Sequence, residues 1–372
     1  MIELNALLAE VANERIGARL LAASPLSLHS DEFWRTDGNS PVRSDRDGVT
    51  VFFSDYIPLG HTLRRRSDHA RAIAGKSIPV KLIDDPDPAV GKWIEALWRD
   101  PTGSLYGWYH AEEIAPCPGR LFIPHIGEVV SRDDGQSWQC RGELLRAPLA
   151  EMDCTWRNGF FAGGYGDLSV VPDRAAKFLY LAFSSYRRDE AAQGIVMARL
   201  PAKRPATPSD GLELWCGDGW RSAATGGAPR PLWPQTRGWR HPDPAGFWGP
   251  AIHYNRGLDA FVLLLNRTAN GSGNFVQEGI YISINETIDN PDGWSPPLQL
   301  VKGGAWYPQV VGLEEGRGDA VADSTARFFM GGFSAWNIEF FRPGGTAGAN
   351  RPLTPTAADF ASAFGADKRS PW

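Results

Sequence analysis

Short runs of aromatic and β-branched residues, separated by turns rich in glycine and proline, dominate this chain. Its 372 residues include 41 glycines and 29 prolines but few helix-like stretches, which favours a sandwich, a barrel or a propeller. Three or four such runs recur about every 60 to 80 residues, five times along the chain. Similar strand groups with divergent loops indicate radial repetition, so we predict an all-β fold, a five-bladed β-propeller.

The two ends of the chain differ from this pattern. Between Met1 and Leu21, apolar residues at helical spacing alternate with acids, which predicts a short amphipathic helix within an N-terminal segment, residues 1–29. The propeller is expected over residues 30–342, and a Pro/Ala/Gly-rich tail, residues 343–372, packs on it or trails from it. The start lacks the basic residues and unbroken apolar centre of a signal peptide, so we expect a cytoplasmic protein unless a leader was removed.

Charge and cysteine content exclude several classes of function. The 43 acidic and 38 basic residues are well mixed, and no basic run is suited to nucleic acid. No apolar stretch reaches the roughly 18 residues of a membrane helix. The four cysteines lack C-x-x-C spacing, which argues against zinc, and we expect them to be reduced and buried. The sequence leaves the oligomeric state open.

One glycine cluster delivers a carboxylate to the start of an apolar run. Residues 163–166 read Gly-Gly-Tyr-Gly and precede Asp167, which opens Leu-Ser-Val-Val. An acid held at the mouth of a strand is a common way to aim catalytic oxygen atoms. The alternative is a hairpin in which Gly-Asp is only a turn signal. Two distant stretches repeat the design, with Asp37 before Gly-Asn-Ser-Pro and Glu278 before Gly-Ile-Tyr-Ile-Ser.

These three stretches resemble motifs of the five-bladed propeller glycosidases of the arabinanase/β-xylosidase type. The runs Asn290–Ser295 and Trp306–Gln309 support the resemblance, which covers most of the predicted propeller. In that family, three acids from different blades converge on a central funnel. The resemblance therefore implies that Asp37 is the base or nucleophile, Asp167 the orienting and pKa-tuning acid, and Glu278 the general acid. The first motif departs from the arabinanase pattern around its Asp, which leaves the substrate open.

A second resemblance concerns a turn. Residues 131–138, Ser-Arg-Asp-Asp-Gly-Gln-Ser-Trp, resemble the Asp box of sialidases and other carbohydrate-active propellers. This implies that Asp133 caps turn amides, Gly135 takes the strained turn position and Trp138 packs between strands. Because sialidases usually carry several such boxes and an arginine triad, a single box without an assignable triad argues against sialidase activity.

Further candidates surround these acids. Glu112 is a rival acid, because it follows a strand of the second group and could point into the same funnel. No metal site is predicted, since a lone His or His-x-Glu is weak evidence for one. No cofactor is required, although related propellers sometimes hold a cation in the central channel, which leaves Ca²⁺ open. The candidate sugar contacts are aromatic faces, amides and histidines, namely Asn39, Trp108, His110, His125, Trp248, Asn266, Trp306, Tyr307 and Gln309.

The chemistry that fits these residues is glycoside hydrolysis. One carboxyl must protonate the leaving oxygen while another attacks or activates water, and their surroundings must keep one protonated and the other ionised. We therefore expect a glycosidase with a carbohydrate substrate. The alternative is a propeller that binds a glycan without cleaving it, because tryptophan is abundant and fold does not imply function.

Overall fold

The computed structural model describes residues 16–28, 36–46, 48–55, 61–67, 78–225, 228–268, 276–312 and 314–342. Within these residues, the only helices are four short 3₁₀ turns: η1 (Leu149–Glu151), η2 (Glu190–Ala192), η3 (Ala223–Thr225) and η4 (Pro291–Gly293). No helix in these ranges is long and apolar enough to cross a membrane. The predicted tail, residues 343–372, and residues 1–15 of the predicted helix lie outside the described residues.

The described strands form five sheets. In spatial order, the first sheet consists of β2 (Val42–Asp45), β3 (Gly48–Asp55), β4 (His61–Ser67) and β5 (Ile78–Pro79). The second consists of β7 (Gly91–Arg99), β8 (Leu105–Ile114), β9 (Phe122–Ser131), β10 (Ser137–Leu145) and β6 (Lys81–Ile83). The third consists of β11 (Tyr165–Pro172), β12 (Phe178–Ser185), β13 (Gly194–Pro201), β14 (Glu213–Trp215) and β15 (Trp220–Ser222). The fourth is β21 (Val321–Ala322), β16 (Gly246–Asn255), β17 (Ala260–Thr268), β18 (Gln277–Asn285) and β19 (Leu298–Lys302); the fifth is β20 (Gln309–Val311), β22 (Thr325–Met330), β23 (Phe333–Phe341) and β1 (Gly17–Ser27).

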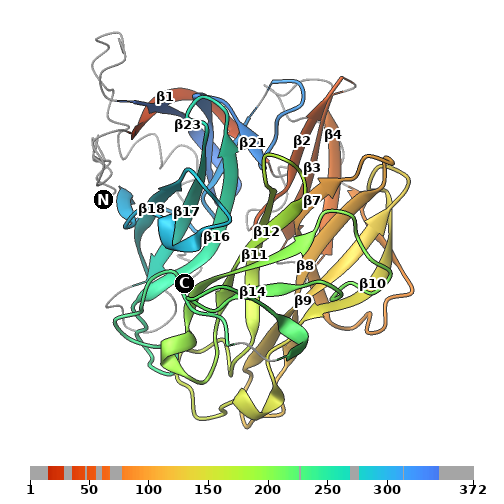
Figure 1. Ribbon diagram of the computed structural model, residues 1–372, viewed down its shortest axis with the longest axis vertical. Helices are drawn as coiled ribbons and strands as arrows, with labels where there is room; N and C mark the ends of the chain where they lie inside the picture. The colour runs from red at the N-terminus through yellow and green to blue at the C-terminus, as the bar shows by residue number, and fades with distance from the viewer. Residues whose placement is uncertain are drawn as a thin grey trace.

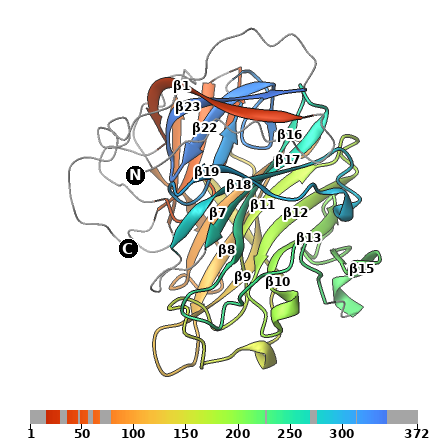
Figure 2. The same ribbon diagram turned by 90° about the vertical axis from the view of Figure 1, so that its left-hand side faces the viewer.

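The sheets pack side by side as the blades of a β-propeller do (Figures 1 and 2). Strand β11 contacts both β7 and β16, so the second, third and fourth sheets meet near the middle of the molecule. Strands pair antiparallel within each sheet, except β6 with β10 and β21 with β16, which are parallel. The prediction of an all-β propeller is confirmed.

The N-terminal segment is a strand where it is described. β1 pairs antiparallel with β23, and Leu20 lies opposite Ile338. Ala18 and Leu20 are buried on one face, while Arg19 Nε on the other face donates to Glu339 at 2.6 Å. The helix predicted between Met1 and Leu21 is therefore wrong over residues 17–21. The edge of β23, more than 300 residues away in sequence, supplies strand partners and overrides the local helical spacing.

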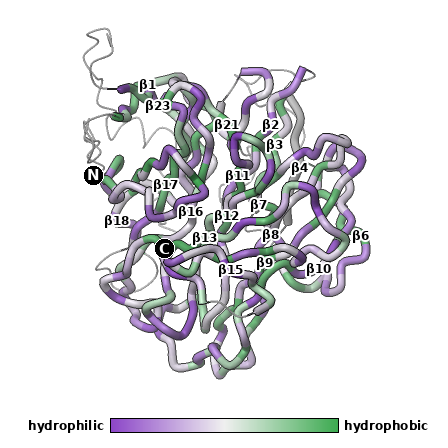
Figure 3. Tube along the Cα trace, viewed as in Figure 1, coloured by the Kyte–Doolittle hydropathy of each residue, from purple (hydrophilic) through white to green (hydrophobic). Residues whose placement is uncertain are grey.

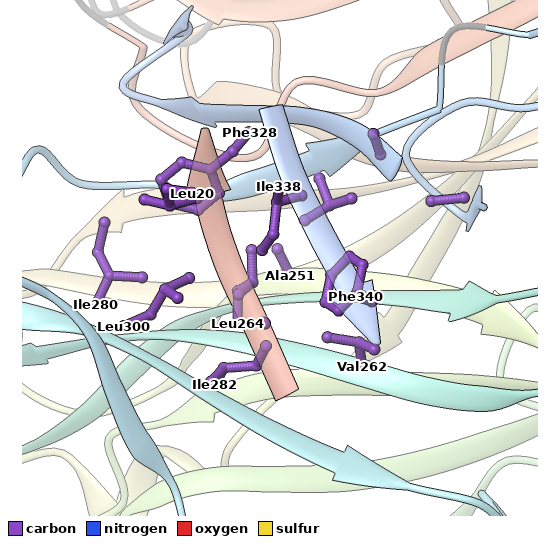
Figure 4. Packing of buried hydrophobic residues seen from close by; sticks show 14 of the residues in the cluster. Leu20, Ala251, Val262, Leu264, Ile280, Ile282, Leu300, Phe328, Ile338 and Phe340 are labelled. Carbon is purple, nitrogen blue, oxygen red and sulfur yellow. The ribbon is translucent and has the colours of Figure 1, made fainter. Parts of the chain in front are cut away.

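Apolar side chains fill the spaces between neighbouring sheets. Figure 4 shows the cluster in which Leu20 of β1 and Phe328 of β22 pack with Leu264 of β17 and Ile280 of β18. This cluster joins the fifth sheet to the fourth. In the hydropathy colouring of Figure 3, green and purple stretches alternate along the strands, and purple is also common in the connections. Burial of alternating strand residues between sheets is the main stabilising term of such a fold.

Two of the four cysteines are joined. Cys117, after β8, forms a disulfide with Cys154, after η1, which lies 37 positions along the chain. Cys140 and Cys216 are free and half-buried. The expectation that all four are reduced is therefore wrong for the first pair. Spacing in the sequence could not reveal it, because only the fold brings these two residues together.

Side-chain and backbone hydrogen bonds hold the turn between β9 and β10. Asp133 Oδ1 accepts hydrogen bonds from the backbone amides of Gln136 and Ser137, at 3.1 and 2.9 Å. Gly135 has a φ of 82°, a region that favours glycine. Trp138 is fully buried, and its Nε1 donates to the Gly135 carbonyl oxygen at 3.2 Å.

Candidate active site

Three inner strands carry β-bulges, and two of these bulges present an acid. The extra residue of β7 is Glu95, and that of β11 is Asp167, as the pairing registers show. A bulge bends its strand and re-aims the side chain of the extra residue. Asp167 has a φ of 39°, which aspartate tolerates better than most residues. The bulge of β16 contains Gly249 and Pro250.

Asn39 links the three bulges. Its side-chain Nδ2 donates to the carbonyl oxygens of Leu168 and Pro250, at 2.8 and 2.7 Å. Its backbone amide donates to Glu95 Oε2 at 3.2 Å, and the Leu168 amide donates to the same oxygen at 3.2 Å. Asn39 is 1% exposed. The amide nitrogen that sequence reasoning offered to a sugar therefore binds backbone carbonyls in two sheets.

Asp37 and Asp167 are brought together by one tyrosine. Tyr307 Oη lies 3.4 Å from Asp37 Oδ1 and 3.3 Å from Asp167 Oδ1. Because both distances share this oxygen, the two carboxylate oxygens are at most 6.7 Å apart, the sum of those two values. Tyr186 Oη donates to the other oxygen of Asp167 at 2.8 Å. Two of the predicted acids thus lie side by side, and Asp167 is held by two tyrosine hydroxyls.

His110 lies between two further carboxylates, those of Glu95 and Glu112. Its Nδ1 contacts Glu95 Oε1, and its ring stacks on Trp93 with centroids 4.6 Å apart and planes 15° apart. Its Nε2 lies 3.9 Å from Glu112 Oε1. Glu112 is partly exposed, with 20% of its side chain accessible to solvent, and Asp37 is half-buried. We call Asp37, Glu95, Glu112 and Asp167, together with His110, the acidic cluster.

Burial and mutual repulsion shift the proton affinities in the acidic cluster. Burial raises the pKa of Asp167 to about 6, and the charge of Glu95 adds to the shift. Burial also raises the pKa of Glu112, with Asp37, Asp167 and Glu95 contributing. Burial raises the pKa of Glu95 and lowers the pKa of His110. Carboxyl groups in such surroundings hold protons closer to neutral pH than free ones do, which acid–base catalysis requires.

Aromatic side chains surround the acidic cluster. Tyr307 and Trp306 each meet Trp248 edge to face, with centroids 5.7 and 5.1 Å apart. The ring of Tyr186 stacks on Phe161 with centroids 4.3 Å apart, and it meets Trp239 edge to face with centroids 5.2 Å apart. The predicted sugar contacts Trp248, Trp306 and Tyr307 thus belong to one aromatic group, in which Trp306 is half-buried. Long loops supply other members of this group, Trp156, Phe161 and Trp239.

The third predicted acid, Glu278, is placed in a salt bridge. One of its oxygens contacts Arg267 Nη1, and the other accepts from Tyr281 Oη at 3.0 Å. The Arg267 guanidinium lies over the ring of Phe247 at 5.6 Å, and Phe247 packs with the cluster between the third and fourth sheets. Arg267 thus occupies an oxygen that a general acid would present to its substrate.

Three other predicted sugar contacts have hydrogen-bond partners within the protein, and a fourth, His125, lies near an acid beyond hydrogen-bond distance. Trp108 is fully buried and donates to Glu128 at 3.0 Å. His125 Nδ1 lies 3.7 Å from Glu113, and burial lowers its pKa to about 4. The buried side chains of Asn266 and Gln309 bind local groups. Asn266 donates to the Gly249 carbonyl at 3.2 Å, while Gln309 bonds the Ser40 amide and carbonyl at 2.8 and 3.1 Å.

Sequence reasoning missed Glu95 and Tyr186. Glu95 is the single acid within the apolar run Trp93–Trp98. A glutamate is seldom fully buried unless it is paired, so its presence there was a usable signal. Tyr186 follows the apolar strand β12 without any distinguishing pattern, and only the fold shows that its hydroxyl reaches Asp167.

Three residues of the acidic cluster, Glu95, His110 and Asp167, carry donor atoms of the kind that bind cations. Among the residues that the structure describes, one donor atom each from Glu95, His110 and Asp167 lies within 4.8 Å of the others. Calcium prefers six to eight oxygen ligands. Here one donor is an imidazole nitrogen, and the carboxylates already accept hydrogen bonds from two amides and two tyrosines. This donor set does not fit Ca²⁺, and we assign no metal to it.

Comparison with known proteins found similar solved structures at low sequence identity. No protein-family model and no curated protein matches the chain. The solved structures that are similar to it include the Bacillus subtilis arabinanase Arb43A, with 14% identity, a TM-score of 0.47, and coverage of 84% of this chain and 95% of that chain. The catalytic domain of the Coprinopsis cinerea GH62 α-L-arabinofuranosidase has 12% identity, a TM-score of 0.48, and coverage of 89% and 98%. An exo-β-1,3-galactanase from Phanerochaete chrysosporium has 11% identity, a TM-score of 0.49, and coverage of 92% and 69%. The names of these three structural neighbours are those of glycoside hydrolases.

Proposed function

We propose that the protein is a glycoside hydrolase in which each of the five sheets is one propeller blade. The observation that carries the proposal is the convergence of Asp37, Glu112 and Asp167, which come from three separate parts of the chain. They lie beside the group of aromatic side chains that includes Tyr307 and Trp248. Glycoside hydrolysis requires paired carboxyl groups of unequal proton affinity, and flat aromatic faces suit sugar rings.

The environments of the carboxyl groups suggest their roles. Asp37 is half-buried and acts as the base or nucleophile. Asp167 is 5% exposed and held by two tyrosines, which suits an orienting and pKa-tuning acid. Glu112 combines a raised pKa with an exposed edge, so it is our general acid in place of the salt-bridged Glu278.

The proposal is tested by screening for released sugar. Purified protein is incubated with arabinan, β-1,3-galactan, and aryl arabinosides, xylosides, galactosides and fructosides. We expect wild-type protein to release a reducing sugar or the aryl alcohol from at least one of them, and the Asp37→Asn variant to release none. Binding of a glycan on an array without any release by wild-type protein would contradict hydrolysis and support the non-catalytic alternative.

The hydroxyl of Tyr307 gives a smaller, separate prediction. The Tyr307→Phe variant keeps the ring packed on Trp248 but removes the group that lies between Asp37 and Asp167. A hydrogen bond to a charged group is worth about 1.5–3 kcal/mol, so kcat/KM should fall about 10- to 100-fold. Steady-state kinetics measure this. Unchanged kinetics would exclude a role for the hydroxyl in holding the two carboxylates.

The Cys117–Cys154 disulfide bears on the compartment in which the protein works. Structural disulfides persist mainly in oxidising compartments. We therefore propose that the protein works outside the reducing cytoplasm, contrary to the expectation from the sequence. Detection of this bond by mass spectrometry of protein purified from its native source, with thiols blocked at lysis, would support the proposal, and free thiols at both positions would contradict it.

The disulfide should also stabilise the fold. Closing a loop of this length limits the unfolded chain and is worth about 2–4 kcal/mol. Equilibrium urea unfolding of the Cys117→Ser/Cys154→Ser variant should show a loss of that size. The Cys140→Ser variant, which removes a free thiol, serves as the control. An equal, small effect in both variants would show that the bond adds little.

A further inference from the structure

We infer that Glu95 and His110 form a positioning pair that fixes the imidazole proton on Nδ1 and turns the lone pair of Nε2 toward Glu112. Nothing in the residue pattern of the sequence assigned a role to Glu95, and His110 was considered only as a sugar contact. The inference rests on the proposed hydrolase and deepens it, because it names the groups that hold the general acid in its protonated, oriented state.

Glu95 is fixed in place by the backbone. It is 0% exposed and is the extra residue of the β7 bulge. The amides of Asn39 and Leu168 both donate to its Oε2. Burial raises the pKa of Glu95, while these two bonds oppose that effect by favouring the carboxylate form, and they occupy one of its oxygens. The other oxygen, Oε1, is left facing His110.

The orientation of His110 follows from its two faces and its two nitrogens. The ring lies flat on Trp93, which fixes its plane. Its Nδ1 contacts Glu95 Oε1. An ionised carboxylate oxygen can only accept, so Nδ1 carries the proton when Glu95 is ionised. Burial lowers the pKa of His110, and the neutral ring then has an unprotonated Nε2. This nitrogen lies on the side of Glu112.

A neutral acceptor beside Glu112 favours the protonated carboxyl. The other groups that face Glu112 act in the same direction or are neutral, namely the carboxylates of Asp37, Glu95 and Asp167 and the hydroxyl of Tyr186. The 3.9 Å from Nε2 to Oε1 is longer than a hydrogen bond, so the carboxyl is free to turn toward a substrate. Glu112 then gives its proton to the glycosidic oxygen as the C–O bond breaks. Water adds to the anomeric carbon and loses a proton. That proton goes to Asp37 where Asp37 is the base, and Glu112 then regains its proton from solvent; it goes to Glu112 where Asp37 is the nucleophile.

The proton position can be tested without any substrate. The ring nitrogens of ¹⁵N-histidine-labelled protein are observed by NMR in the presence of EDTA, and the His110→Phe variant identifies the His110 signals. We expect a protonated Nδ1 and an unprotonated Nε2 across neutral pH. The reverse tautomer, or a charged ring, would overturn the inference. If His110→Phe does not fold, the shifts in the Glu95→Gln variant identify the same signals.

The Glu95→Gln variant gives the sharper result. The carbonyl of the new amide must take the place of Oε2 to accept the two backbone bonds, so its NH₂ faces His110 Nδ1. The imidazole proton should then move to Nε2, on the side of Glu112, where an N–H favours the ionised carboxyl and lowers the pKa of that acid. We expect the tautomer to reverse and the alkaline limb of the kcat/KM profile to move about one pH unit lower.

The same variant should lower kcat about 10- to 100-fold with little change in KM, as expected for a group that acts through another. The matched control is His241→Gln, an exposed histidine beside Glu190, which should change neither the tautomer nor the profile. An unchanged tautomer in Glu95→Gln would refute the pair. A reversed tautomer in a protein that cleaves none of the sugars would instead refute the proposed hydrolase and leave the pair intact.

Discussion

Replacing Asp37 with Asn is expected to lower kcat/KM by about 1,000-fold or more while leaving the free energy of unfolding within about 0.5 kcal/mol of the wild-type value. General acid–base groups contribute about 10²- to 10⁴-fold to rates, and loss of a nucleophile costs at least as much. The side chain is half-buried at the edge of the acidic cluster, so the amide should be accommodated without repacking.

The matched variant Asp167→Asn separates charge from shape. Asparagine tolerates the left-handed backbone at this bulge, and its carbonyl oxygen can still accept from Tyr186 Oη. We expect about a 100-fold loss of kcat/KM without loss of stability. Asp210→Asn, at an exposed turn position, is the control. Wild-type rates in both cluster variants would show that these carboxylates do not perform the chemistry.

Removing the side chain of Glu128 is expected to destabilise the protein by about 3–5 kcal/mol, the cost of leaving buried charges without their partner. Glu128 is 0% exposed in β9. Its oxygens accept from Arg141 Nε at 2.7 Å, Arg204 Nε at 2.8 Å and Trp108 Nε1 at 3.0 Å. The Arg204 side chain is also 0% exposed, and burial lowers its pKa. This ion cluster ties the segment after β13 to the second sheet.

Urea unfolding of Glu128→Ala measures this effect. Glu143→Ala is the control, because Glu143 also pairs with an arginine, Arg146, but its side chain is 43% exposed. Exposed ion pairs contribute about 0–1 kcal/mol, so the control should lose no more than that. Equal losses in the two variants would contradict the view that burial makes the Glu128 cluster structurally important.

The propeller could be predicted because its signal is local and repeated. Turn-forming residues separate each strand from the next, so the strand groups are visible without knowledge of their partners. The strand over residues 17–27 was not visible, because its pairing edge in β23 comes from the other end of the chain. The Cys117–Cys154 bond was hidden for the same reason.

The candidate site was predictable to the extent that its residues carry turn signals. Asp37 and Asp167 sit among glycines and turn formers that mark a change of direction before a strand. Glu278 carries a similar signal, but the cross-strand neighbour Arg267 pairs with it, and such neighbours are fixed by register rather than by local sequence. Glu95 was missed because its apolar run reads as core, although its bulge presents it to the acidic cluster.

The most direct test of the account compares Glu112→Gln with Glu278→Gln on aryl glycosides of one sugar that differ in leaving-group acidity. A general acid matters most when the leaving group is poor. We therefore expect Glu112→Gln to lose about 10²- to 10⁴-fold in kcat/KM on a glycoside with a poor leaving group but to keep most of its activity on the 2,4-dinitrophenyl glycoside. Glu278→Gln should follow the wild-type protein on both substrates. The reverse assignment, with leaving-group dependence in Glu278→Gln and none in Glu112→Gln, would contradict the central claim that the acidic cluster contains the general acid.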